Sequence, residues 1–355
     1  MFKTLIAAIR RIREAAGATP PQSARFDWLM TVLGLWFAGG VFLDGWAHNH
    51  LASALETFFT PWHAVMYSGF TACALALAVA AVINRRRGYA WSRSLPAGYM
   101  PSLAGAGIFA AGGGFDLFWH LTFGIEKNIE ALLSPAHLIL ALGAVLVVGG
   151  PFRAAWRRSE PPKGLIASLP MLLSMTFMLS LVTFMTQFAH PVRHAATGVK
   201  PDGTMADVLQ GRAAAGFVMQ TALLAGFALL AVRRWGRSLP MGAFAVVFGA
   251  NMFGMSQMTD EQRLVWGAIL AGLAADWMNR KLAPSIKDPV ALRRFGAKVP
   301  MVYALAVFMT LLATEGVWWS VHMWSGVIVI SGVAGYFLAY LLAPPPMPFT
   351  SPIKQ

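Results

Sequence analysis

Apolar runs of roughly 20 residues recur along the whole chain of 355 residues, and they constrain its fold more than any other feature. Hydrophobic residues make up 57% of the sequence and charged residues only 12%, about half the charged share of an ordinary soluble domain. A run of this length crosses a bilayer as an α-helix, because a helix satisfies its own backbone hydrogen bonds. The sequence therefore predicts an all-α fold, a polytopic integral membrane helical bundle.

We expect about ten transmembrane helices within a transmembrane domain at 25–343. A duplicated four-helix unit occupies 25–157, and six further helices occupy 164–343. Residues 1–24 form an amphipathic surface helix and a linker, and 344–355 form a proline-rich cytoplasmic tail. The helix centres are expected near Gly34, Ala74, Ala106, Val145, Met175, Leu224, Val246, Leu270, Phe308 and Val333.

The basic residues alternate between the two faces of the predicted bundle. If the N-terminus is inside, 23 of the 28 Lys and Arg residues lie in inner loops or inner ends. By the positive-inside rule this asymmetry places both termini in the cytoplasm of a multi-pass protein in the bacterial inner membrane. The formal charge of +13 is thus explained by topology. The lipid bilayer is the expected partner, and nucleic acid is not.

Two stretches of the chain repeat one pattern of polar residues. The first lies between Gly40 and Gly69, and the second between Gly112 and Gly143. Each reads Gly-x3-Asp-x3-His, then a gap, then Glu-x3-[Ser/Thr]-Pro-x-His-x5-Gly. Only the gap between the first His and the Glu differs, by two residues. Ionisable residues that recur in one order within apolar surroundings predict a duplicated metal-ligand unit.

The spacing places the candidate ligands at helix ends. Each Asp-x3-His pair shares one helix face, and each Ser/Thr-Pro step suits the start of the next helix. The predicted metal ligands are Asp44, His48 and His63 in the first unit and Asp116, His120 and His137 in the second. Glu56 and Glu130 are the predicted catalytic residues, which would move protons beside the metal. Two mononuclear sites and one shared binuclear site are both compatible with this spacing.

The donor set restricts the metal. The single cysteine, Cys73, falls in an apolar run, so thiolate ligation and an intrachain disulfide are excluded. A carboxylate with two imidazoles suits a transition metal ion, and copper, iron and zinc all fit this donor set. All eight histidines fall at predicted outer ends or outer loops. The site is therefore expected to face the periplasm.

At Asp44-x3-His48-x14-His63 and Asp116-x3-His120-x16-His137 the chain resembles the C subunit of the copper membrane monooxygenases, the particulate methane and ammonia oxidisers. That family carries Asp-x3-His-x12-His across two adjacent membrane helices and binds copper there. The resemblance implies two copper sets and an oxidoreductase of monooxygenase type. This chain differs in its longer gaps, its two copies of the motif and its larger number of helices.

Several other functions fit the same residues. A glutamate beside the metal would suit a zinc-dependent membrane hydrolase. Metal transport is a further alternative, and so is a b-type haem protein with His63 and His137 as axial ligands. The non-metal interpretation makes the repeated residues interfacial helix caps. The small or lipophilic substrate, the electron donor, and the presence of partner subunits or a homo-oligomer stay open. So do the roles of His190, His194, Glu315 and His322.

Overall fold

The computed structural model describes residues 18–51, 59–124, 126, 129–191, 200 and 202–345. Over these ranges the regular structure is helical, apart from one isolated bridge between Ser285 and Asp288. The predicted all-α class is confirmed for this part of the chain. The surface helix predicted within 1–24 falls mainly outside the described residues, as does most of the tail predicted at 344–355.

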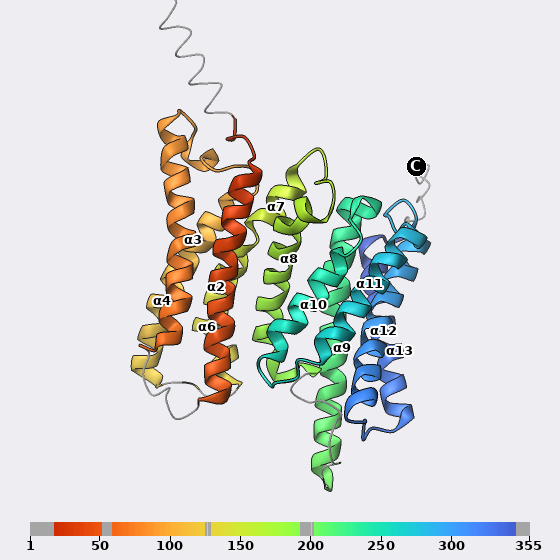
Figure 1. The fold of residues 1–355 in the computed structure, drawn as a ribbon. Helices are drawn as coiled ribbons and strands as arrows, with labels where there is room; N and C mark the ends of the chain where they lie inside the picture. Colours follow the sequence, from red (N-terminus) through yellow and green to blue (C-terminus); the bar gives the residue numbers. More distant parts are fainter. Residues whose placement is uncertain are drawn as a thin grey trace, which may run out of the picture.

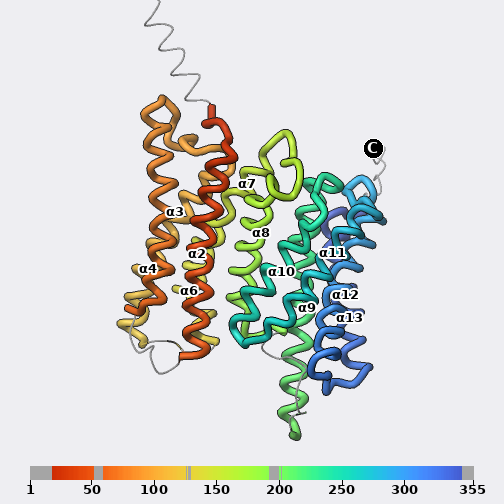
Figure 2. Tube along the Cα trace, in the orientation of Figure 1, coloured from red at the N-terminus to blue at the C-terminus, as the bar shows by residue number. Residues whose placement is uncertain are grey.

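The helices form two groups that lie side by side (Figures 1 and 2). The first group comprises α2 (Ala24–His50), α3 (Pro61–Arg86), α4 (Met100–Phe123), α5 (Glu130–Leu133), α6 (Pro135–Val148) and α7 (Gly150–Arg157). The second comprises α8 (Leu165–Met185), α9 (Thr204–Trp235), α10 (Ala243–Ser256), α11 (Leu264–Leu282), α12 (Pro289–Thr314) and α13 (Val321–Leu342). Helix α8 packs against α2 and α6 on one side and against α10 on the other.

All ten expected helix centres lie within helices, but the expected count of about ten membrane spans does not hold by length and composition. Six described helices are long and apolar enough to cross a membrane, or seven if α6 and α7, bent by 45°, count as one. Helix α10 has 14 residues, about 21 Å, which is shorter than a hydrocarbon core of about 30 Å. Helices α4 and α11 are not among the six. Glycines make α4 less hydrophobic, and α11 ends in polar residues. The six spans still indicate a multi-pass membrane protein in a lipid bilayer.

Glycines bring the helices of each repeated unit into close contact. A Cβ on Gly40 of α2 would lie 2.6 Å from the Met66 Cα of α3, and one on Gly69 would lie 2.8 Å from the Phe37 Cα. In the second unit a Cβ on Gly143 of α6 would lie 2.7 Å from a backbone nitrogen of α4. Real Cβ atoms do not approach so closely, so the backbones of α2 and α3, and of α4 and α6, meet only because these positions lack side chains.

A buried polar network joins three helices of the second group. The Asn251 amide nitrogen on α10 donates to Ser180 Oγ at 3.1 Å and to Thr183 Oγ1 at 2.9 Å, both on α8. Its oxygen accepts from Gln220 of α9 at 3.0 Å. Asn251 is fully buried, so these bonds satisfy polar groups that lipid could not solvate.

Replacing Asn251 by Leu should destabilise the protein by about 1–3 kcal/mol, because Gln220 and the α8 hydroxyls would remain buried without that partner. Chemical unfolding in detergent micelles measures the change. Thr71→Val is the matched control, since this exposed hydroxyl bonds only to the carbonyl of Tyr67 on its own helix. Equal stability of the Asn251→Leu and Thr71→Val proteins would show that the network contributes little.

Candidate metal centre

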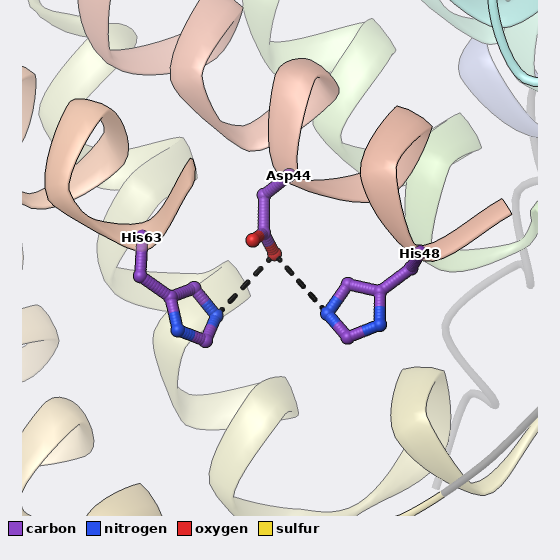
Figure 3. A group of neighbouring side chains, drawn as sticks. All are labelled: Asp44, His48 and His63. Carbon is purple, nitrogen blue, oxygen red and sulfur yellow. Dashed lines mark ion pairs between the residues drawn. The ribbon is translucent and has the colours of Figure 1, made fainter. Parts of the chain in front are cut away.

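The first set of predicted ligands lies where α2 ends and α3 begins. Asp44 and His48 are one turn apart at the end of α2. Thr60 caps α3 by accepting from the His63 backbone N–H at 3.1 Å, and Pro61 occupies the first helical turn, so His63 points from the start of α3 toward α2. Figure 3 shows both imidazoles directed at one carboxylate oxygen from opposite sides. His48 Nε2 and His63 Nε2 lie 3.7 and 3.4 Å from Asp44 Oδ2.

The second set repeats this arrangement between α4 and α6. Asp116 and His120 are one turn apart on α4, and Ser134 caps α6 with Pro135 at its first position. His120 Nε2 and His137 Nε2 lie 3.5 and 3.6 Å from Asp116 Oδ1. The similar distances in the two units show that the repeated sequence folds into two similar clusters.

The spacing in each cluster suits ligation better than hydrogen bonding. Charge-assisted N–H···O bonds are about 2.7–2.9 Å long, shorter than any of these four separations. Donors about 2.0–2.2 Å from a tetrahedral metal are instead roughly 3.3–3.6 Å apart. In each set one atom from each of the three residues lies within 4.8 Å of the others. Asp44 Oδ1 and Asp116 Oδ1 are buried and lack a hydrogen-bond partner among the described residues. The donor set thus fits a transition metal ion.

Contacts on the far side of the imidazoles orient two ligands of the second set. Glu126 Oε2 lies 3.0 Å from His120 Nδ1, and the Gly124 carbonyl oxygen lies 3.3 Å from the same nitrogen. Ser134 Oγ lies 2.7 Å from His137 Nδ1. The Gly124 carbonyl and the Glu126 carboxylate only accept, so they favour a proton on His120 Nδ1, which leaves His120 Nε2 unprotonated and able to bind metal. The Ser134 hydroxyl can either donate to His137 Nδ1 or accept from it. Both Nε2 atoms face Asp116.

The two clusters are near neighbours. His63 is close enough to interact electrostatically with Asp116 and His137 of the other set, and His120 interacts with His48. Tyr67, one turn after His63 on α3, interacts with both Asp44 and Asp116. Its ring lies edge-on to that of His63, with centroids 6.2 Å apart. The clusters therefore belong to one polar region at one end of the first helix group.

The clusters differ in their access to the surroundings. The side chains of the first set are 15%, 42% and 18% exposed for Asp44, His48 and His63. In the second set Asp116 is only 4% exposed and His120 10%, while His137 is 27% exposed. The first set is thus the more open of the two.

Of the two predicted catalytic glutamates, the structure describes only Glu130. Glu56 lies outside the described residues. Glu130 begins α5 and is exposed, and no ion pair joins it to a histidine in the described part of the chain. Glu126, which is not part of the repeated motif, contacts His120 instead. Glu126 lies six residues after His120, and the equivalent position after His48 is Ala54. A comparison of the two repeats therefore could not reveal Glu126 as a site residue.

The secondary candidates do not extend either set. His190 is buried at the end of η3 (Gln187–Ala189), and His194 lies outside the described residues. Glu315 pairs with Arg263, and His322 is an exposed residue in the first turn of α13. His50 stacks on Trp46 and approaches Asp260 at 3.3 Å. The two triads are the only such groups of three within the described ranges.

Comparisons with protein-family models, with curated proteins and with solved structures find no match to this chain.

Replacing Glu126 by Gln should weaken metal binding at the second set by about 10- to 100-fold, because the carboxylate beside His120 Nδ1 would be lost. A competition titration with a colorimetric chelator, in a His48→Ala/His63→Ala background, isolates this set. Glu130→Gln is the matched control and should leave the affinity unchanged. An equal loss of affinity in the Glu130→Gln protein would show that Glu126 has no specific role in orienting His120.

Proposed function

We propose that this chain is an integral membrane metalloprotein of the bacterial inner membrane, with its carboxylate–histidine centre at the periplasmic face. We propose further that it is a copper or iron oxidoreductase of monooxygenase type, acting on a small or lipophilic substrate. The observation that carries the proposal is the convergence of six repeated Asp and His residues into two clusters with ligand-like spacing.

The choice between metals rests on the donors. Two imidazoles and one carboxylate with open positions are typical of non-heme iron oxygenases. The resemblance of the two Asp-x3-His…His motifs to copper membrane monooxygenases favours copper. Either ion, when bound, would supply redox chemistry toward dioxygen. The chain's own residues hold and orient the ligands: Ser134 and Glu126 fix two imidazoles, and the Thr60 and Ser134 caps fix the starts of α3 and α6.

Apolar side chains beside the centre support a lipophilic substrate. Phe118, Leu121 and Phe123 lie on α4 around the second set and are 58%, 79% and 66% exposed. Phe59, directly before the Thr60 cap, is 81% exposed. In a bilayer such side chains contact lipid tails, so a substrate dissolved in the membrane could approach the clusters without crossing a polar barrier.

Among the described residues, each alternative function lacks a feature that it needs. A zinc hydrolase needs a carboxylate beside the metal-bound water. Glu126, however, lies against the Nδ1 side of His120, away from the nitrogen that faces Asp116. A haem held by His63 and His137 would require their Nε2 atoms to face one iron, whereas they face two different aspartates. Metal transport would need ionisable groups along a path, and buried Asp27 lies at the opposite end of α2 from Asp44.

The proposed orientation rests on the distribution of basic residues. Helix α13 ends at the end of the bundle where α2 begins (Figure 1). An even number of passes would return the chain to its starting side. The 23 basic residues assigned to that side favour the cytoplasm.

Cysteine labelling tests the orientation. In a Cys73→Ala background, a cysteine at Lys200 should react with an impermeant maleimide in intact spheroplasts. A cysteine at Lys287, an exposed residue between α11 and α12, should react only after permeabilisation. The reverse pattern would place both clusters on the cytoplasmic side.

Metal binding tests the centre itself. His137→Ala should abolish binding at the second set, because two remaining donors hold a metal far more weakly than three. Asp116→Asn keeps a neutral oxygen donor and should reduce the affinity less. His50→Ala is the matched control and should retain full binding, since this histidine contacts Asp260 instead of a triad. Unfolding curves must accompany each titration, because lost metal can also reflect a lost fold. Full binding by His137→Ala protein would refute the assignment.

A further inference from the structure

A cavity of about 460 Å³ lies at the end of the bundle opposite the two clusters. It is bounded by the segment before α4, by α7 and by α9. Most of its wall is apolar, and its apolar lining residues include Leu95, Pro96, Met100, Phe152, Trp156 and Leu230. Two guanidinium groups, those of Arg153 and Arg157, line the same space.

Helix α7 places these groups at the edge of the bundle. It follows α6 after a 45° bend, where Gly149, Gly150 and Pro151 interrupt the span. One face of α7 is buried through Phe152, Ala154 and Ala155, while Trp156 is half-buried. A short amphipathic helix with a tryptophan at the end of a span is typical of the interface between lipid tails and headgroups.

The two arginines lie one turn apart, and no described residue neutralises their positive charges. Arg153 Nε donates to the Gly98 carbonyl at 3.0 Å, and its Nη2 donates to Ser102 Oγ at 2.8 Å and to the Leu146 carbonyl at 2.6 Å. All three acceptors are neutral. Arg157 is exposed. In the part of the chain that the structure describes, no carboxylate lies within ion-pair distance of either residue.

The two carboxylates on neighbouring segments, those of Asp27 and Glu160, do not line this cavity. Asp27 accepts from Tyr99 at 2.7 Å and pairs with Arg158. Glu160 lines a neighbouring hollow that it shares with Arg157, Arg158 and Gln22, and it does not line the apolar cavity. A partly buried guanidinium is unfavourable without a counter-charge, so the cavity is electrostatically suited to an anion.

We propose that this cavity binds one anionic phospholipid. The phosphate would contact the Arg157 guanidinium within the positive field of Arg153, and an acyl chain would lie along the partly exposed Met100, Trp156 and Leu230. The charge selects an anion, and the mostly apolar wall selects one that carries a hydrocarbon chain. Basic pockets between membrane helices on the inner side bind acidic lipid headgroups by the same two interactions.

Native mass spectrometry of the delipidated full-length protein tests this proposal. Titration with dioleoyl phosphatidylglycerol should give one tightly retained lipid, and dioleoyl phosphatidylcholine should bind at least tenfold more weakly. Arg157→Gln should weaken phosphatidylglycerol binding by about tenfold, through loss of a charge-assisted hydrogen bond. Arg87→Gln is the matched control, because it removes an exposed arginine outside the cavity and should leave the affinity unchanged.

A second variant tests the apolar part of the site. Ala97→Trp adds bulk to the cavity wall without changing charge and should also displace the lipid, while thermal unfolding reports whether the fold is retained. Equal weakening by Arg157→Gln and Arg87→Gln would overturn the site in favour of general surface attraction. Equal competition by glycerol 3-phosphate or inorganic phosphate would assign a soluble anion instead. Lipid binding that appears only after removal of residues 2–17 would make that segment the natural occupant.

Discussion

The close backbone contact between α2 and α3, repeated between α4 and α6, is the constraint on which the candidate centre depends. Gly40 and Gly69 allow the first pair of helices to meet, and Gly143 allows the second. Each contact sets the distance between a helix that supplies an Asp–His pair and a helix that supplies the last His. Without these glycines the helix ends would move apart, and three donors could not converge within 4.8 Å.

The cost of placing polar groups in a membrane explains how the rest of the molecule is arranged. The ionisable residues of the clusters gather at one end of the first helix group, where they lie against one another. Within the second helix group the buried polar residues around Asn251 are uncharged and satisfy one another. At the other end, Asp27 is matched by Arg158. Arg153 and Arg157 have no such match in the described ranges, which makes them candidates for a lipid phosphate.

Local sequence signals indicated most of what was found. The Ser/Thr-Pro caps and the i, i+4 spacing of Asp44 and His48 depend only on neighbouring residues, so the helix ends could be anticipated. The number of membrane spans could not be anticipated from the sequence. Helix α10 and helix α6 are both apolar, but α10 is short and α6 is followed by a bend at glycines. Glu126 was missed because the first repeat has Ala54 at the equivalent position, so the repeated motif does not include it.

X-ray absorption at the metal edge, combined with elemental analysis of purified protein from metal-replete cells, tests the central claim most directly. We expect stoichiometric copper or iron with only nitrogen and oxygen neighbours, including imidazole scattering, at about 2.0–2.2 Å. Protein without stoichiometric metal, or a metal with a sulfur neighbour at about 2.3 Å, would contradict it. In either case the six repeated residues would be interfacial caps and would not form a metal centre.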